Sequence, residues 1–157
     1  MRTVELEHLR PAEVLSELKR CPIAYLPAGP VEWHNPVNPL GTDGFIARKT
    51  AIEAAQRTGG VVYPTLFVGS DCPRPKWHLE KLGFDNPDQY IVGMDFPNLP
   101  MKSYYYPVEV VSILLSATVE MLIDHGYKLI VVLNGHGAAT QNTLVDELCL
   151  KYSNTSN

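Results

Sequence analysis

The sequence is organised around one stretch, Leu26-Pro-Ala-Gly-Pro-Val-Glu-Trp-His-Asn-Pro-Val-Asn-Pro-Leu-Gly-Thr-Asp43. The apolar run Ile23–Leu26 leads into it and is typical of a buried strand. A loop rich in proline and glycine then presents two carboxylates and an imidazole, those of Glu32, His34 and Asp43. Oxygen and nitrogen donors this close together are what a divalent metal ion needs. The stretch therefore predicts a strand followed by a metal-binding loop.

A second loop offers a further donor. Asn134-Gly-His-Gly137 follows the apolar run Lys128–Leu133, which is typical of a strand covered on both faces. Both loops follow a predicted strand and precede a predicted helix. Ligands of parallel sheets bind beyond the carboxyl ends of the strands. We therefore expect four donors to converge at one edge of the sheet: Glu32, His34, Asp43 and His136.

Strands and helices alternate along the chain. The hydrophobic spacing predicts helices over 10–19, 45–57, 107–123 and 138–150, and strands over 23–26, 61–68 and 128–133. This alternation predicts an α/β fold with three layers, α/β/α, around a mostly parallel central sheet. A length of 157 residues fits one domain, residues 1–157.

The regular pattern is interrupted from about 69 to 106, where prolines and aromatic residues dominate. A loop this long in a compact domain is usually functional, and its aromatic residues favour an ordered cover over a site or a surface against another subunit. Within it, His78 is expected at the surface, and Tyr104-Tyr-Tyr106 is expected to serve packing or an interface. The polar end, about 152–157, is expected to fray.

Composition limits the class of protein. A hydrophobic content of 45% with 19% charged residues is ordinary for a soluble globular chain, and a net charge of −4 gives no reason to expect nucleic acid. The longest apolar stretch, Val108–Ile123, contains acidic and polar residues, so it predicts a core helix and no membrane span. The cysteines Cys21, Cys72 and Cys149 are widely spaced, which predicts reduced thiols and a cytoplasmic location.

Three motifs resemble those of the creatininase (creatinine amidohydrolase) family. They are Leu26-Pro-Ala-Gly-Pro-Val-Glu-Trp-His34, Pro39-Leu-Gly-Thr-Asp43 and Leu133-Asn-Gly-His-Gly137, in the family's order. The resemblance spans roughly 20 to 150 and implies a C-terminally short member. It implies a metal-dependent amidohydrolase that uses a metal-activated water on a C–N bond of a small cyclic or formyl amide. It also implies zinc or manganese, or iron, with up to two ions per chain, and a homo-oligomer, commonly a hexamer.

By this resemblance, Glu32 and His136 would bind one ion, His34 would bind the other, and Asp43 would bridge them. Two ions held by a shared carboxylate can lower the pKa of a water molecule between them. The sequence assigns no separate catalytic residue. In creatinine hydrolases a glutamate two positions after the loop histidine also binds metal, whereas Ala138 stands here. The alternative is therefore a catalytically impaired or truncated member that keeps the fold and binds a metal, a ligand or a partner.

Overall fold

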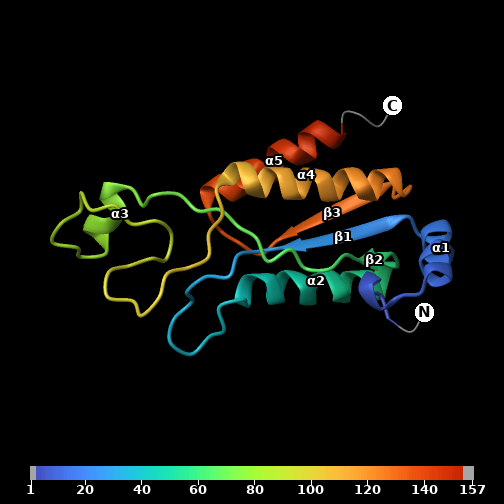
Figure 1. Cartoon of the computed structure of the whole chain (residues 1–157), viewed down its shortest axis with the longest axis horizontal. Coiled ribbons are helices and arrows are strands. Elements are labelled where there is room, and N and C mark those ends of the chain that lie inside the picture. The colour runs from blue at the N-terminus through green and yellow to red at the C-terminus, as the bar shows by residue number, and fades with distance from the viewer. Residues whose placement is uncertain (1–2, 154–157) are drawn as a thin grey trace.

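The computed structural model describes residues 3–153 and shows three parallel strands between layers of helices (Figure 1). In chain order the elements are a 3-10 turn Leu6–His8, α1 Pro11–Arg20, β1 Ile23–Ala28, α2 Thr42–Thr58, β2 Val61–Val62, α3 Lys76–Lys81, α4 Val108–Asp124, β3 Leu129–Asn134 and α5 Ala139–Ser153. The predicted α/β class with a parallel central sheet is confirmed.

The sheet has the order β2-β1-β3, with β1 in the centre. β1 pairs with β3 in register from Ile23 opposite Leu129 to Ala28 opposite Asn134. The two strands therefore end level with each other, and the residues that follow them emerge side by side. The Gly135 N–H donates to the Ala28 carbonyl at 2.9 Å, which joins the two loops at their base.

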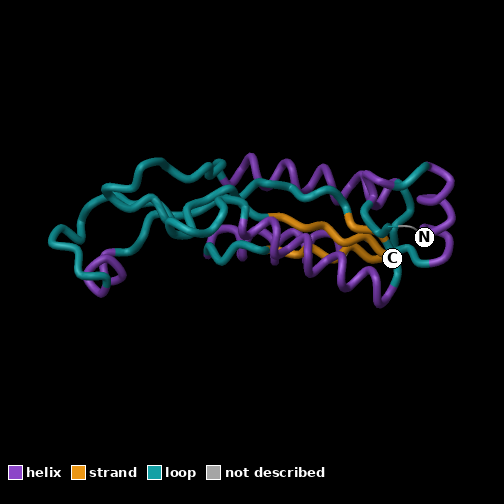
Figure 2. The backbone as a smooth tube through the Cα atoms, turned by 90° about the horizontal axis from the view of Figure 1, so that it is seen from below, coloured by secondary structure: helices purple, strands orange, loops and turns teal. Residues whose placement is uncertain are grey.

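Helices cover both faces of the sheet, as Figure 2 shows. Leu26 and Ala28 of β1 pack on one face against α4 and α5, and Tyr25 packs on the other face against α2. The first face is filled by buried side chains of the two helices, namely Val111, Leu115, Val119, Leu144 and Leu148. Full burial of a leucine side chain stabilises a fold by roughly 1.5–3 kcal/mol. This core fixes the position of the strands and therefore of their ends.

Two predicted boundaries differ from the structure. α2 begins at Thr42, so Asp43 lies in the first turn of a helix rather than in a loop. The positive end of the helix dipole favours a carboxylate there. The strand predicted over 61–68 is wrong beyond Val62, because Pro64 has no N–H to donate to a neighbouring strand. The chain still follows β1, and Leu66 forms an isolated bridge with Ala28.

The segment 69–106 projects beyond the ends of the strands (Figures 1 and 2) and contains one short helix, α3. An isolated bridge between Val31 and Tyr104 connects it to the rest of the chain. α5 continues through Ser153, so the fraying predicted for 152 and 153 is wrong, and 154–157 lie outside the described residues. No helix within residues 3–153 is long and apolar enough to cross a bilayer. A single domain over the whole chain stays a prediction.

Candidate metal centre

The four predicted donors lie together beyond the ends of β1 and β3. Glu32 comes from the loop after β1, Asp43 from the first turn of α2 and His136 from the loop after β3, and all three are buried. One candidate ligand atom from each of these three lies within 4.8 Å of the others. The fourth, His34, places Nε2 3.3 Å from Glu32 Oε1. The register of the parallel strands explains why residues a hundred positions apart meet here.

Asp43 lies between two imidazole rings. Its Oδ1 is 2.9 Å from His34 Nε2, and its Oδ2 is 3.0 Å from His136 Nδ1. Each carboxylate oxygen therefore faces a different histidine. This division would allow the carboxylate to bridge two cations through different oxygens.

His136 is held in one orientation by a backbone carbonyl. Its Nε2 lies 3.1 Å from the Ser70 oxygen, which can only accept a hydrogen bond, so Nε2 carries the proton and Nδ1 faces the carboxylates. The Ser70 N–H in turn donates to Gln141 Oε1 at 2.9 Å, and Gln141 Nε2 donates to Asn134 Oδ1 at 3.0 Å. Ligating histidines usually have their second nitrogen fixed in this way.

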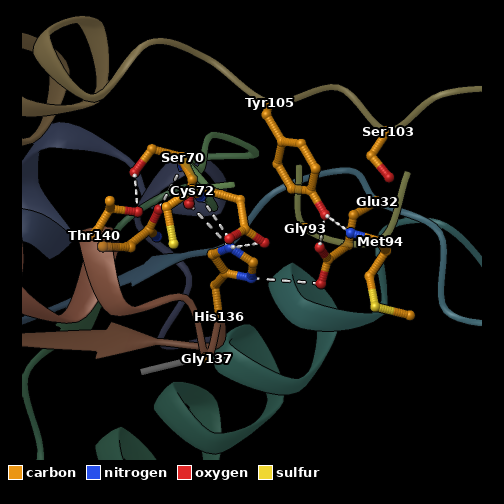
Figure 3. A network of polar contacts seen from close by, with 12 residues as sticks. Glu32, Ser70, Cys72, Gly93, Met94, Ser103, Tyr105, His136, Gly137 and Thr140 are labelled. Carbon is orange, nitrogen blue, oxygen red and sulfur yellow. Dashed lines mark hydrogen bonds and ion pairs between the residues drawn. The ribbon is translucent and has the colours of Figure 1, made fainter. Parts of the chain in front are cut away.

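Tyr105 orients Glu32 from the other side of the site, as Figure 3 shows. Its hydroxyl donates to Glu32 Oε2 and accepts the Met94 N–H at 3.1 Å. Burial and the neighbouring Glu32 raise the pKa of Tyr105, so the hydroxyl stays protonated and remains a donor. With Oε2 occupied, Oε1 is the oxygen that Glu32 turns toward the histidines.

Sequence reasoning missed the contact of Tyr105 with Glu32. The two residues are 73 positions apart, and Tyr105 lies in a segment without periodicity, so no spacing signal connects them. It also missed Gln141, which is fully buried on α5. A polar residue on the inner face of a predicted helix was the available signal. His78, expected at the surface, is half-buried and lines a cavity beside the donors.

A proton on His136 offsets part of the negative charge at the site in the metal-free chain. Burial alone would lower the pKa of His136, but its hydrogen bonds with Asp43 and Glu32 outweigh burial and raise this pKa to about 9. Burial likewise would raise the pKa of Glu32, yet hydrogen bonds with His136 and Tyr105 lower it overall. An ionised Glu32 thus lies beside the imidazolium of His136.

The residues fit a divalent cation. The donor set is two carboxylates and two imidazoles, which suits zinc, manganese and iron alike. His34 Nε2 is buried and has no hydrogen bond of acceptable geometry among the described residues, although both carboxylates are near. A cation between the carboxylates and this nitrogen would satisfy it. The role of the four residues as ligands stays a prediction.

The fold and the site define an α/β protein with a candidate metal centre at the ends of parallel strands. The sequence model of the creatininase family, described as creatinine amidohydrolase, matches residues 7–80. The crystal structure of creatinine amidohydrolase superposes with a TM-score of 0.71 at 18% identity, over 98% of this chain and 54% of that one. A creatininase variant complexed with creatine gives a TM-score of 0.71 at 19% identity, over 98% and 55%. The resemblance to the creatininase family that the three motifs predicted is confirmed by this match over residues 7–80 and by the shared fold.

A curated relative adds a second hydrolase to the comparison. The 3-dehydro-scyllo-inosose hydrolase of Thermotoga maritima is 25% identical over 125 residues, which cover 80% of this chain and 33% of the relative. The chain thus spans about half the length of the creatininase structures and a third of this relative.

Proposed function

We propose that the chain is a metal-dependent amidohydrolase of the creatininase type, which hydrolyses a C–N bond in a small cyclic or formyl amide. The single observation that carries this proposal is Asp43, whose two oxygens face His34 and His136 separately. The match to the creatininase family model over residues 7–80 and the shared fold support the same class. One of the similar creatininase structures is a manganese form and another is a zinc–zinc form, which supports these metals for the site.

The chain's own residues would supply binding and orientation. When bound, divalent ions would polarise the amide carbonyl and lower the pKa of water. Asp43 would hold the two halves of the site together, with His34 on one side and Glu32 and His136 on the other. Tyr105 keeps Glu32 in place, and the Ser70 carbonyl keeps Nδ1 of His136 turned to the site.

Metal content and metal-dependent hydrolysis test this proposal together. We expect purified protein to contain up to two equivalents of zinc or manganese per chain. Chelation should remove hydrolysis of small cyclic and formyl amides, and added zinc or manganese should restore it. The compound named for the Thermotoga relative, 3-dehydro-scyllo-inosose, belongs in the same assay. If wild-type protein hydrolyses none of these compounds with any added metal, the proposed enzymatic activity is refuted.

The alternative is a member that keeps the fold and binds a metal, a small ligand or a partner without hydrolysis. Ala138, where the resemblance implies a metal-binding glutamate, is the observation that favours it. Its side chain is buried and lines the cavity beside the donors. One bound metal per chain together with no turnover would support this alternative.

We also propose that the chain forms a homo-oligomer, a hexamer by resemblance. Among the described residues β3 pairs only with β1, so its other edge is open to a further strand. Beside this edge an apolar cavity of about 490 Å³ lies between α4, β3 and α5, and Leu129 is 52% exposed. Uncovered strand edges and apolar faces favour association. A monomer at micromolar concentration in light scattering would contradict this. A cytoplasmic location stays a prediction, which fractionation of the cells would test.

A further inference from the structure

A cavity of about 300 Å³ lies beside the candidate metal centre. At one part of its wall are the donors Glu32 and His136, and at another are Arg74, His78 and Met94 of the segment 69–106. A cavity of this size suits a small molecule. The cavity thus joins the candidate metal centre to residues that the proposed reaction leaves without a role.

Arg74 in this wall has unused hydrogen-bonding capacity. Its Nε donates to the Gly93 carbonyl, while Nη1 lies 3.2 Å from His78 Nδ1 and Nη2 lies 3.3 Å from Met94 Sδ. A guanidinium has five N–H donors, and a thioether is a weak acceptor. Within residues 3–153, no carboxylate oxygen lies within 4.0 Å of the Arg74 guanidinium.

Other arginines of the chain contrast with Arg74. Arg10, Arg20 and Arg48 each form an ion pair with a glutamate, at 3.0, 2.5 and 2.5 Å. Arg74, which like Arg48 is half-buried, instead has its Cζ 5.0 Å from the centre of the Phe96 ring. This stacking and the bond to Gly93 hold the guanidinium in place before any ligand arrives. A fixed guanidinium matches the two oxygens of a carboxylate.

Asp71, an acidic residue of the cavity wall, is directed elsewhere. Its Oδ1 accepts the Cys72 N–H at 2.7 Å, and its Oδ2 lies 3.8 Å from His136 Nε2. Asp71 therefore adds negative charge near the candidate metal centre and leaves Arg74 unpaired. The Asp71 carboxylate therefore repels an anionic group of a ligand in the cavity, and the Arg74 guanidinium attracts it.

We propose that Arg74 binds a carboxylate of the substrate, so that the substrates are small amides that carry a carboxylate. This inference rests on the proposed function. The amide lies at Glu32 and His136, and the carboxylate lies against the Nη atoms of Arg74. A neutral amide leaves Arg74 without a partner in a partly desolvated wall, which makes Arg74 the residue that selects anionic substrates.

A pair of matched lactams tests this selection. 5-Oxoproline carries a carboxylate, and 5-oxoprolinamide is the neutral equivalent of nearly the same size. Binding of each is measured by ligand-observed NMR titration on chelated and on zinc-loaded protein, and hydrolysis is measured in parallel. Wild-type protein should bind 5-oxoproline at least about tenfold more tightly than the neutral amide, since charged hydrogen bonds are strong.

Three variants separate selection from structure. Arg74→Gln should bring the ratio of the two affinities close to one, and Arg74→Lys should keep an intermediate preference. Lys81→Gln, which removes the same charge from an exposed position of α3, should keep the wild-type ratio. Equal weakening of both lactams in Arg74→Gln would show a structural role and overturn the proposal.

The outcomes for binding and for hydrolysis are distinguishable. Charge selection without any hydrolysis would refute the proposed function and keep the carboxylate subsite. Hydrolysis without charge selection would keep the function and overturn the subsite. Failure of wild-type protein to bind either lactam at millimolar concentration would overturn the subsite as well.

Discussion

The sheet with its helices and the segment 69–106 contribute differently to one site. The sheet region places Glu32, Asp43 and His136 through the ends of β1 and β3 and the start of α2. The irregular segment supplies Ser70 and Tyr105, which orient two of these donors. Strand register therefore decides where the donors lie, whereas contacts between distant residues decide which of their atoms face the site.

The largest effect is expected when an aspartate of the sheet region is changed to asparagine, with the same change in the irregular segment as its control. Asp43→Asn removes the charge of the carboxylate between the two histidines while keeping its size. Metal affinity should fall by more than about a hundredfold, because the loss of residues that only orient ligands already costs about 10–100-fold. Hydrolysis should fall below detection. Metal titration and the amide assay measure the two effects.

Asp85→Asn is the matched control in the irregular segment. Asp85 is exposed, so the same loss of charge there should leave metal affinity within about twofold of wild type. Circular dichroism should show both variants folded. Equal metal affinity in Asp43→Asn and wild type would remove Asp43 from the site.

A smaller effect tests the contact across the two regions. Tyr105→Phe removes the hydrogen bond to Glu32 Oε2 and leaves the Met94 N–H without its acceptor. Metal affinity should fall about 10–100-fold, as for other residues that orient ligands. Tyr104→Phe is the control, since Tyr104 is 59% exposed and should tolerate the change. If both variants bind metal like wild type, the irregular segment has no part in the site.

Two glycines after β3 test how tightly the sheet region packs beside the site. A Cβ at Gly135 would lie 2.2 Å from the Asp43 carbonyl oxygen, so Gly135→Ala must displace the start of α2. A Cβ at Gly137 would have no heavy atom within 4 Å. Overpacking usually costs about 1–3 kcal/mol. Denaturant unfolding should therefore show that loss for Gly135→Ala and a change within about 0.5 kcal/mol for Gly137→Ala.

The sequence predicted the sheet region well because its signals are local. Apolar runs and helical spacing led to β1, β3 and α4, and the rule for parallel strand ends brought His136 to Glu32. The start of α2 was predicted three residues too late, which left Asp43 in the loop, because the N-cap residue Gly41 has no side chain to mark the helix start. Tyr105 could not be connected to Glu32, because tertiary contacts across 73 residues leave no periodic pattern.

The smallest effect is expected at Glu17, which is buried on α1 and makes no contact with the candidate metal centre. Its Oε1 accepts the Gly60 N–H at 2.7 Å, and its Oε2 accepts Arg20 Nε at 2.8 Å. The hydrogen bond from Arg20 lowers the pKa of Glu17, and the opposing effect of burial, which raises it, is smaller. Glu17→Gln should reduce the free energy of unfolding by about 1–2 kcal/mol at pH 7.

The pH dependence of this loss identifies its cause. Because the pKa of Glu17 is lower in the folded chain than the ordinary value of 4.5, its contribution is fully present above pH 4.5 and is lost as the pH falls below that value. The difference between Glu17→Gln and wild type should therefore shrink in acid, measured by denaturant unfolding at several pH values. Glu53 forms an ion pair with Lys49 and its side chain is 51% exposed, so Glu53→Gln should lose little unfolding free energy at any pH. The metal affinity of Glu17→Gln should equal that of wild type. A loss of metal affinity in this variant would mean that the contact between Glu17 and Gly60 is coupled to the candidate metal centre. A difference that stays constant down to pH 3 would assign the loss to packing rather than to the charge of Glu17.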